Sequence, residues 1–267
     1  MSDPARSPAI TIVGAERLAE LAALEGVAEA VFGRGRRQPG WFRRKLIREG
    51  VEAPLSSLAV AHEQIHGYAL LGRSPSLGMI ARGAGIGVVP RSRGRGLGRA
   101  LLEHTLVRAR ASGCDAIEFL AEPARVGWYL AQDFALLDEQ LTLLARGTGE
   151  AGATLAAGAE PPARAQALWS WIPEVWERTP PSERAFTEIG GARMWLSREG
   201  RAWLVHRCEL DDPAALGPCL TALRSRLAPT TPLLLYPCPA ASAWTDGLLR
   251  TGFEAAQRSF VVRRELG

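Results

Sequence analysis

The chain has 267 residues with a formal net charge of +4, and 47% of them are hydrophobic. This composition is that of a globular protein, long enough for one large or two modest domains, and its charge is too mild to indicate nucleic-acid binding on its own. No secretory signal pattern and no apolar run of membrane-spanning length stand out, and the four cysteines follow no metal or disulfide spacing. We therefore expect a soluble cytoplasmic protein with reduced thiols, no metal and no membrane partner.

The N-terminal segment predicts a strand and two helices joined by a basic loop. Residues 10–13 form a short apolar run, residues 16–32 have helical spacing, and a further helix begins near Trp41. The loop between the helices carries Arg34, Arg36 and Arg37. These arginines and Trp41 are candidates for contact with an acidic or aromatic acceptor, or with DNA, although most basic runs of this kind are simply solvated. Nucleic-acid binding is therefore kept as a minor alternative.

The string His62-Glu63-Gln64-Ile65-His66 matches the signature of zinc proteases. That site requires a helix, because a helix places histidines four residues apart on one face. The flanking runs 58–61 and 68–71 have strand length, and Gly67 follows the second histidine directly. No histidine, cysteine, aspartate or glutamate occurs between Gly67 and Leu102 to complete a zinc site. The segment therefore predicts a β-hairpin that turns near the Glu-Gln pair, and it disfavours a metalloprotease.

Residues 84–120 predict a strand, a glycine turn, a helix and a second strand. The first strand covers 84–89 and ends at Pro90. The turn has the pattern Arg-x-x-Gly-x-Gly, and it leads into a helix whose apolar residues recur at helical spacing up to Gly113. The second strand covers 116–120. Such a turn exposes a row of backbone N–H groups at a helix N-terminus, where the helix dipole favours an anion such as a pyrophosphate.

Two common phosphate-binding motifs do not fit this turn. A P-loop requires Gly-Lys followed by Ser or Thr, and the only lysine of the chain, Lys45, follows Arg44. A dinucleotide site requires Gly-x-Gly-x-x-Gly with an acidic residue about 20 positions later. The glycines here stand at 94, 96 and 98, and Glu118 falls near the required distance but inside the next strand. A nucleotide hydrolase is therefore excluded, and a Rossmann site is disfavoured.

The order of these elements resembles the Gcn5-related N-acetyltransferase (GNAT) family, and a second segment supports the resemblance. In the family, a helix carries a tyrosine and a Gly-Phe pair ends five residues later. Tyr129 and Phe134 keep this spacing, whereas Asp133 replaces the usual glycine and Glu122 replaces a frequent asparagine. The resemblance covers about residues 8–146 and is strongest at the glycine turn.

The resemblance implies a mixed α/β (α+β) fold, in which a central, mixed but mostly antiparallel sheet is flanked by helices, and it implies acetyl-CoA or a related acyl-CoA as co-substrate, without a metal. Backbone N–H groups of the glycine turn would hold the diphosphate, because glycine lets the main chain approach closely and adopt positive φ. The pantetheine arm would pair with the main chain near Gly87 and Val89, where the family splays two parallel strands apart. The implied coenzyme contacts are Gly87, Val88, Val89, Arg93, Gly94, Arg95, Gly96, Leu97, Gly98 and Arg99.

The resemblance also implies a catalytic tyrosine. Tyr129 matches the family residue that donates a hydrogen bond to the leaving thiolate. The pKa of a free thiol is about 8.5. Many family members place a glutamate on the strand before the glycine turn, and this chain has no acidic residue there. Glu118, Glu122, Glu63 and His66 are candidates for the base by residue type only, and Glu118 and Glu122 are the two that we select.

The C-terminal part predicts a second, smaller and degenerate GNAT-like domain. Residues 147–165 are rich in Gly, Ala and Pro and indicate a linker, which follows a closing hairpin at 136–144. The elements expected after the linker are strands at 192–196 and 202–205, a helix at 212–227, a strand at 233–236, a helix ending at Arg250 and a strand at 259–263. This order repeats that of the first domain, with Gly252-Phe253 in the place of the earlier Asp-Phe pair.

The second domain departs from the family pattern at its turn. The segment Cys208-Glu-Leu-Asp-Asp-Pro-Ala contains no glycine, and acidic residues at a helix start satisfy the helix dipole themselves and repel a pyrophosphate. We expect no CoA binding there, and a structural or acceptor-shaping role instead. The predicted domains are a catalytic domain at 1–146, a linker at 147–165 and the degenerate domain at 166–267.

The sequence therefore predicts a tandem N-acyltransferase that transfers an acetyl or related acyl group from acetyl-CoA to an amine by direct attack in a ternary complex. The acceptor is a small-molecule amine or a peptide N-terminus, and no residue specifies which. The alternative from another class is a protein that binds or senses acyl-CoA without turnover. The missing strand glutamate favours this alternative, and Tyr129 opposes it. The oligomeric state stays open.

Overall fold

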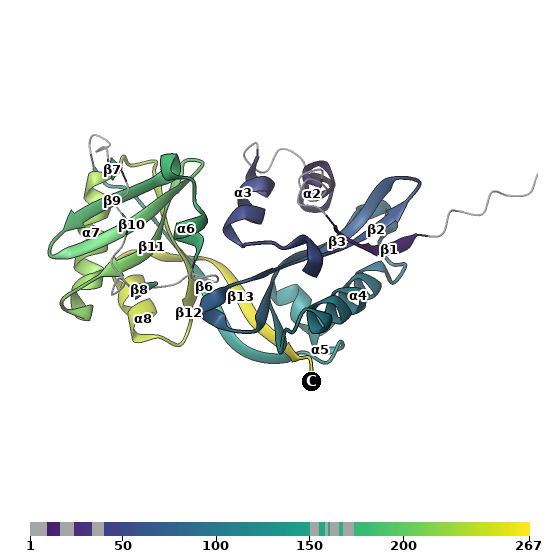
Figure 1. Cartoon of the computed structure of the whole chain (residues 1–267). Coiled ribbons are helices and arrows are strands. Elements are labelled where there is room, and N and C mark those ends of the chain that lie inside the picture. The colour runs from purple at the N-terminus through teal and green to yellow at the C-terminus, as the bar shows by residue number, and fades with distance from the viewer. Residues whose placement is uncertain are drawn as a thin grey trace, which may run out of the picture. The chain divides into compact units, whose positions relative to one another are not determined.

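The structure, a computed structural model, describes residues 10–16, 24–33, 40–149, 155–157, 160, 166–167 and 174–267. The chain divides into two compact units (Figure 1). The first unit contains Met1–Phe119, Gln132–Phe134 and Arg263–Gly267, and the second contains Leu120–Ala131 and Ala135–Val262. Part of the first predicted helix (17–23) and the basic loop with Arg34, Arg36 and Arg37 lie outside the described residues.

The sheet of the first unit has the strand order β1-β2-β3-β4-β5. Its strands are β1 (Thr11–Gly14), β2 (Ser57–Ala61), β3 (Gln64–Arg73), β4 (Ile80–Val88) and β5 (Ala116–Ala121). The first four are antiparallel neighbours, and β4 pairs with β5 in parallel. The parallel pair needs a long crossover, which is supplied by helix α4 (Leu97–Ala111).

Helices cover both faces of this sheet (Figure 1). Successive side chains of a strand point to opposite faces, so each strand contributes to two core clusters. Tyr68 of β3 packs with α2 (Glu25–Phe32) and α3 (Trp41–Arg48), whereas the next residue, Ala69, packs with Leu101 of α4. The sheet that leads into the glycine turn is therefore packed against a hydrophobic core on both of its faces.

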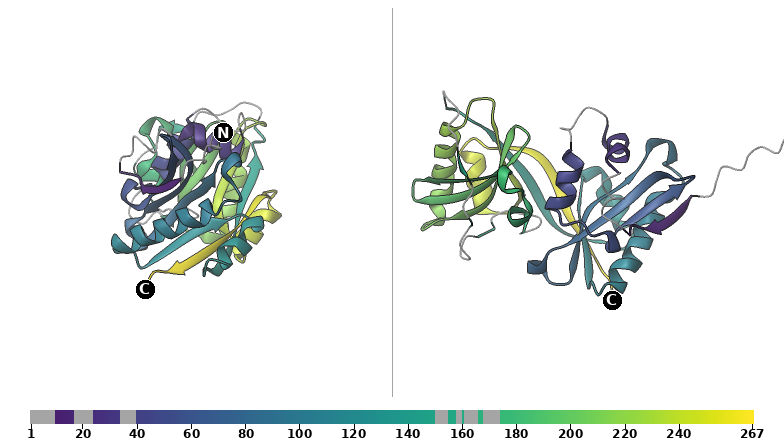
Figure 2. Two further views of the ribbon diagram at one scale, coloured as in Figure 1. Left: turned by 90° about the vertical axis from the view of Figure 1, so that its right-hand side faces the viewer. Right: turned by 45° about the horizontal axis from the view of Figure 1, so that its top comes forward.

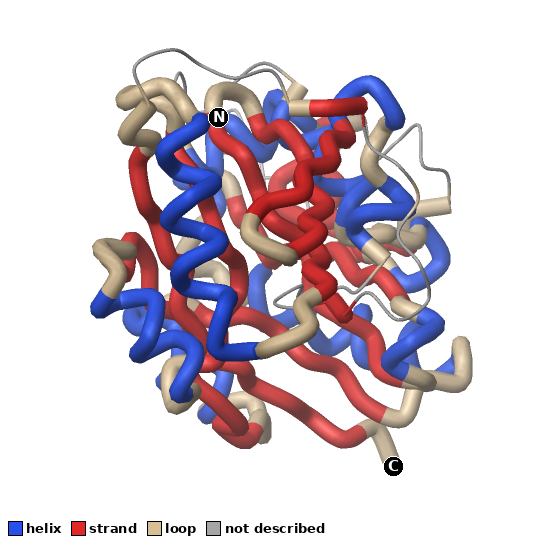
Figure 3. Tube along the Cα trace, turned by 90° about the vertical axis from the view of Figure 1, so that its left-hand side faces the viewer, coloured by secondary structure: helices blue, strands red, loops and turns tan. Residues whose placement is uncertain are grey.

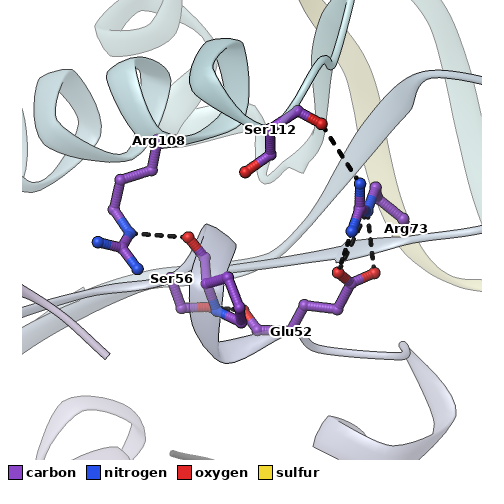
Figure 4. Close-up of polar contacts among 6 residues, drawn as sticks. Glu52, Ser56, Arg73, Arg108 and Ser112 are labelled. Carbon is purple, nitrogen blue, oxygen red and sulfur yellow. Dashed lines mark hydrogen bonds and ion pairs between the residues drawn. The ribbon is translucent and has the colours of Figure 1, made fainter. Parts of the chain in front are cut away.

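The C-terminal end of α4 is tied to the sheet by two arginines (Figure 4). Arg108 Nε donates to the carbonyl oxygen of Pro54 at 2.8 Å. Arg73 of β3 donates to the carbonyl oxygen of Ser112 at 3.5 Å, and its Nε lies 3.0 Å from Oε1 of Glu52 in a two-pronged ion pair. These contacts fix the end of α4 that lies away from the glycine turn.

The second unit contains a sheet with the strand order β13-β6-β12-β11-β10-β9-β7, and β8 pairs with β11. Its strands are β6 (Ala135–Arg146), β7 (Ala156–Ala157), β8 (Gln166–Ala167), β9 (Arg184–Ile189), β10 (Ala192–Glu199), β11 (Ala202–Glu209), β12 (Pro232–Pro239) and β13 (Glu254–Glu265). Its helices are α5 (Val126–Leu130), α6 (Val175–Arg178), α7 (Leu216–Arg226) and α8 (Ala243–Arg250). As in the first unit, one strand pair is parallel: β11 with β12, joined through α7.

The core of the second unit lies between its sheet and the helices α7 and α8. Leu220 of α7 and Leu248 of α8 are fully buried in the same cluster as Met194, Val205 and Leu235 of the strands. The four cysteines, Cys114, Cys208, Cys219 and Cys238, are buried and form no disulfide in the described structure. Three of them belong to this core cluster and therefore serve as small apolar side chains.

The last residues of the chain belong to the first unit (Figure 2 marks the C-terminus). The backbone N–H of Leu266 donates to the carbonyl oxygen of Asp115 at 2.8 Å, just before β5. Arg110 of α4 donates from Nε to the carbonyl oxygen of Leu266 at 2.5 Å. Leu266 is itself buried, so this terminal segment is part of the structure of the first unit.

This architecture confirms the predicted fold class, a mixed α/β chain with helix-flanked sheets (Figure 3). The predicted strand, glycine turn, helix and strand are present, although β4 begins at Ile80, four residues earlier than expected. The hairpin around the zinc-protease string is also confirmed. His62 and Glu63 form its turn with φ of 48° and 60°, and β3 starts at Gln64.

One predicted element is wrong, and several short elements were missed, namely β7, β8, α6 and β9. The expected hairpin at 136–144 is a single strand, β6, which pairs with β12 from Gln140 to Arg146. The pair Asp138-Glu139 lacks the glycine or asparagine that a tight hairpin turn favours, so the chain does not reverse there. Glu139 instead forms an ion pair with Arg258 of β13 at 3.0 Å. The strand β9 was not predicted, because its sequence Arg-Ala-Phe-Thr-Glu-Ile carries only a short alternation.

The described part of the predicted linker is bonded within the second unit. Gly147 N donates to the carbonyl oxygen of Thr231, and Gly149 N donates to that of Leu227, both at 2.9 Å. The short strand β7 pairs with β9. The backbone is closely packed at Gly147, since a Cβ on this residue would lie 2.3 Å from the carbonyl oxygen of Ala228. Glycine at this position therefore reflects close packing. The predicted domain boundaries themselves stay a prediction.

Candidate functional site

The glycine turn between β4 and α4 is the candidate site. Gly96 is the N-cap residue of α4, and in the described part of the chain no side chain caps this helix and no acidic residue stands in its first turn. The helical ladder begins with the bond from Ala100 N to the carbonyl oxygen of Gly96 at 3.0 Å. The N–H groups of the three residues before Ala100 therefore have no carbonyl four residues earlier within the helix. They and the positive end of the helix dipole form a site suited to an anion.

The conformation of the turn explains its glycines. Gly94 and Gly96 have φ of 73° and 77°, a region that residues with a Cβ rarely adopt. A Cβ built on either glycine would meet no atom within 4 Å. The restriction to glycine thus comes from the backbone and not from crowding, and the space in front of both residues is open to a ligand.

The parallel pairing of β4 and β5 is short. It covers Ile80–Arg82 against Ala116–Glu118, whereas β4 runs on to Val88. Just beyond the last pair, β4 has a bulge at Ala84, because Leu70 of β3 faces Gly85 and Leu71 faces Gly83. The second half of β4 therefore pairs with β3 on one side and has no partner strand from β5 on the other.

The register of β3 and β4 decides which backbone groups of β4 face that unpaired edge. Val89 N donates to the carbonyl oxygen of His66 at 2.9 Å, so Val89 faces β3. In an antiparallel pair the bonded positions alternate, so Gly87 also faces β3. The N–H and C=O groups of Ile86 and Val88 therefore point to the edge left by β5. The pantetheine pairing expected near Gly87 and Val89 stays a prediction, and Ile86 and Val88 are the residues there whose backbone groups face the unpaired edge.

The arginines around the turn differ in their availability. Arg91 Nη2 donates to Oε1 of Gln64 at 2.9 Å, and Arg93 donates to the carbonyl oxygens of Val88 at 3.0 Å and Val31 at 3.3 Å. Arg99 lies 4.0 Å from Glu103 in an exposed pair. Arg95 is exposed, and its side chain forms no hydrogen bond or ion pair with a described residue. Of the arginines predicted to contact the coenzyme, Arg95 is thus the most available for a phosphate.

The two glutamates predicted as base candidates lie in different environments. Glu118 of β5 is buried, with 4% of its surface exposed. Its Oε2 is 2.7 Å from Nη2 of Arg82, and its Oε1 is 3.6 Å from Nη1 of Arg263. Glu122 is exposed and precedes the short 3-10 helix Pro123–Arg125. Glu118 therefore joins β4, β5 and the C-terminal residues by ion pairs, which no spacing in the sequence indicated.

Tyr129 lies on α5 and is buried, with 7% of its surface exposed. Burial raises the pKa of its phenol far above the usual value near 10, and the nearby Arg125 offsets this only in part. The hydroxyl therefore stays protonated at neutral pH and is suited to donate a hydrogen bond. Its ring packs edge to face on Trp128, with 4.9 Å between centroids.

The segment after α5 accounts for the departure from the family pattern at Asp133. This residue adopts φ of 61°, the left-handed conformation for which the family usually uses glycine. Aspartate tolerates that region better than most residues, and its carboxylate lies 3.7 Å from Nη2 of Arg264. Phe134 is buried and packs on Phe119 with 6.0 Å between centroids. The substitution therefore preserves the turn.

The remaining sequence candidates that the structure describes are Glu63, His66 and Trp41. The described residues contain no group of three histidine, cysteine or carboxylate side chains that could hold a metal ion. Glu63 is exposed in the hairpin turn, and His66 Nδ1 lies 2.9 Å from Ser92 Oγ. Trp41 is buried in the core against Phe32 and Phe42, so it does not present its ring to an acceptor. Among the helices that the structure describes, none has the length and apolarity to cross a bilayer.

In the second unit, the turn before α7 has the predicted acidic character. Asp212 Oδ1 accepts a hydrogen bond from Ala214 N at 2.9 Å, at the start of the 3-10 helix Pro213–Ala215 that leads into α7. A side chain thus takes up a backbone donor in this turn, whereas no described side chain caps the start of α4.

The chain matches one protein family and several solved structures. Residues 54–136 match the acetyltransferase (GNAT) domain family. A candidate acetyltransferase from Pyrococcus horikoshii superimposes with a TM-score of 0.70 at 11% identity, over 99% of this chain and 92% of that one. A Gcn5-related N-acetyltransferase from Sphaerobacter thermophilus gives 0.62 at 13% identity, over 96% of each chain. A tandem GNAT protein from the clavulanic acid biosynthesis pathway gives 0.59 at 12% identity, over 98% and 99%.

These similarities carry the family assignment. No curated protein sequence matches the chain. The solved structures are too distant in sequence to carry more than the fold, and the family match spans the hairpin, the glycine turn and the tyrosine helix described above. The chain therefore carries an acetyltransferase domain of the GNAT family at residues 54–136.

Proposed function

We propose that the protein transfers an acetyl or related short acyl group from an acyl-CoA to an amine. The observation that carries the proposal is the start of α4, where two glycines at positive φ open onto free space and the first turn has neither a capping side chain nor an acidic residue in the described chain. A diphosphate satisfies such a helix start by accepting several backbone hydrogen bonds.

The coenzyme would be held along two surfaces of the first unit. The N–H groups of Gly96, Leu97, Gly98 and Arg99 would bind the diphosphate, with Arg95 adding its charge. The pantetheine amides would pair with Ile86 and Val88 at the edge of β4, like an added strand. Arg93 donates to the carbonyl oxygen of Val88 in this structure, so pantetheine pairing at that oxygen would require the arginine to shift.

The reaction requires a neutral amine. For an acceptor with a pKa of about 10.4, deprotonation at pH 7 costs roughly 4–5 kcal/mol. The amine nitrogen then attacks the thioester carbonyl carbon, the C–N bond forms, and the C–S bond breaks. The proton of the amine leaves to a base or to water, and the hydroxyl of Tyr129 donates to the departing sulfur. Its raised pKa keeps that hydroxyl protonated for this purpose.

For the base we propose Glu122 over Glu118. Glu122 is exposed, whereas Glu118 is buried and held by Arg82 and Arg263. The carboxylate of Glu118 is engaged by two guanidinium groups and shielded from solvent, so an acceptor amine cannot readily reach it. We assign Glu118 the role of holding β4 and β5 together at the last pair before the strands separate.

We further propose that the C-terminal part is a degenerate GNAT-like domain that binds no CoA. The domain limits proposed from the sequence are 1–146 and 166–267, with a linker between them. The acidic turn before α7 supports this, because Asp212 occupies the backbone donor of Ala214 in the 3-10 helix that leads into α7 and adds negative charge there.

Two measurements test the proposed function. Isothermal titration with CoA should give binding at one site per chain, and release of free thiol from acetyl-CoA should occur with at least one member of a panel of small amines and peptide N-termini. Absence of CoA binding would overturn the proposal. Binding without turnover on any amine would favour the alternative of an acyl-CoA sensor, to which the lack of an acidic residue between Gly67 and Leu102 also points.

A further inference from the structure

The second histidine of the zinc-protease string, His66, makes a tertiary contact that is unrelated to metal binding. His66 lies on β3, and its Nδ1 is 2.9 Å from Oγ of Ser92. Ser92 is buried, with 2% of its surface exposed, and ends the 3-10 helix Pro90–Ser92 that precedes the glycine turn. The two residues are separated by 26 positions in the sequence, so the contact is a tertiary one.

Two further contacts join the same two segments. The backbone N–H of Val89 donates to the carbonyl oxygen of His66 at 2.9 Å. Arg91 donates from Nη2 to Oε1 of Gln64, also at 2.9 Å. The start of β3 therefore holds Val89, Arg91 and Ser92 by one main-chain bond and two side-chain bonds. Of these, the His66 contact reaches the buried residue that is nearest to the glycine turn.

The place of Ser92 makes this contact relevant to anion binding. Only Arg93 separates Ser92 from Gly94, the first residue of the turn at positive φ. Several N–H groups bind one diphosphate well only if they converge before the ligand arrives, because ordering them afterwards costs affinity. A fixed point directly before Gly94 reduces that cost.

We infer that His66 is a positioning residue for the coenzyme diphosphate: through Ser92 it holds the glycine turn in the conformation that presents its N–H groups. The inference rests on the proposed function, since it takes the turn to be the CoA site. It gives the hairpin that carries the zinc-protease string a role in coenzyme binding, with no metal involved.

Three variants isolate this contact. His66→Leu and Ser92→Ala each remove it, and each should weaken CoA binding about five- to tenfold, the loss expected for one hydrogen bond. The double variant should bind no more weakly than either single variant, because both remove the same interaction. His66→Asn should restore most of the affinity, because the asparagine amide stands where Nδ1 of histidine does. His62→Asn is the matched control, since His62 is exposed in the hairpin turn at φ of 48°, which asparagine tolerates.

A second readout separates positioning of the turn from general loosening of the fold. S-acetylpantetheine lacks the diphosphate but shares the reacting thioester. With an amine found in the panel above, His66→Leu should raise KM for acetyl-CoA and leave kcat/KM for S-acetylpantetheine unchanged. Equal losses with both donors, additive losses in the double variant, or unchanged CoA affinity in Ser92→Ala would overturn the inference. If the unmodified protein binds no CoA, the proposed function itself has failed, and that outcome is recognised before any variant is compared.

Discussion

The turn before α4 in the first unit and the turn before α7 in the second unit occupy the same place in two strand–helix–strand segments. Each segment pairs its strands in parallel over a few residues, ending at Arg82 with Glu118 and at Leu204 with Leu234. Among the described residues no side chain caps α4 or α7, but Asp212 supplies an acceptor to Ala214 N in the 3-10 helix just before α7, and no acidic side chain does so before α4. Both units thus share the parallel strand pair with a helical crossover. They differ in the turn residues, which would determine whether an anion binds at the helix start.

The strands that precede these two turns, β4 and β11, also differ in the side chains that they carry after the last parallel pair. Each has a bulge two residues after its last parallel pair, at Ala84 in β4 and at His206 in β11. The positions that follow at the same register are Gly85 and Gly87 in β4, and Arg207 and Glu209 in β11. Glu209 forms an ion pair with Arg193 at 3.0 Å. Small residues thus border the separated strands in the first unit, and charged side chains with partners border them in the second.

Giving the first turn the charge of the second should abolish coenzyme binding. In Gly96→Glu, the carboxylate repels a diphosphate at the helix start, and the side chain must also adopt φ of 77°. We expect CoA affinity to fall by at least about 100-fold in isothermal titration. Gly96→Ala imposes the backbone strain without the charge and should lose only about tenfold or less. A glutamate variant that is folded by circular dichroism and binds CoA normally would refute the proposed site.

The tyrosine helix offers a second contrast. Tyr129 precedes Phe134 by five residues, and Leu248 precedes Phe253 by five in the corresponding segment, so only the first carries a hydroxyl. Tyr129→Phe should lower kcat by about 100-fold while CoA affinity stays constant, because the donor acts on the leaving sulfur. Since the pKa of Tyr129 is raised, its proton is retained as pH increases, and the rate of the unmodified enzyme should not decline below about pH 10 through this group. A phenylalanine variant with full kcat would remove Tyr129 from the mechanism.

The acidic turn of the second unit should matter for stability and not for CoA. Asp212→Ala removes the acceptor of the Ala214 N–H and should lower the free energy of unfolding by about 1 kcal/mol. Urea denaturation followed by circular dichroism measures this loss. Asp211→Ala is the matched control, because Asp211 is the adjacent exposed acid, and its effect should stay within about 0.5 kcal/mol. Equal effects of both variants would show that the hydrogen bond is not what stabilises the turn.

A smaller effect is expected at the pair Tyr68 and Gly87, which stands at the register of Arg193 and Glu209. The hydroxyl of Tyr68 is buried and has no hydrogen-bond partner among the described residues. Tyr68→Phe should therefore leave the melting temperature unchanged or raise it slightly, since no bond is lost. Gly87→Ala should lower it, because a Cβ would lie 2.8 Å from Cζ of Tyr68. A clear loss of stability in Tyr68→Phe would reveal a partner for the hydroxyl.

The local features of the first unit were predictable because their signals are short. The strand, the glycine turn and the helix follow from periodicity and from glycines within one stretch, and Gly67 identified the hairpin despite the zinc-protease string. The error at 136–144 has a local cause as well. Asp138 and Glu139 resemble a turn in composition, but the strand continues because β12 pairs with it on one side and β13 lies on the other.

The contacts that complete the candidate site join residues far apart in sequence. Glu118 meets Arg263, and His66 meets Ser92, and no periodicity or motif links such positions. The choice of backbone groups at the edge of β4 has the same origin, since the hydrogen bond from Val89 to His66 fixes which of them face β3. Single-sequence patterns identify the turn that would hold the diphosphate, and tertiary pairing decides how it is held.

The assignment of Arg263–Gly267 to the first unit has a consequence for biosynthesis. The ribosome must translate more than 140 residues beyond Glu118 before Arg263 can reach it and before Leu266 can bond to Asp115. The first unit therefore forms these contacts only after the second unit has been synthesised, and Glu118 lacks one of its two cations until then. Expression of residues 1–146 alone would leave that half permanently in the unfinished state.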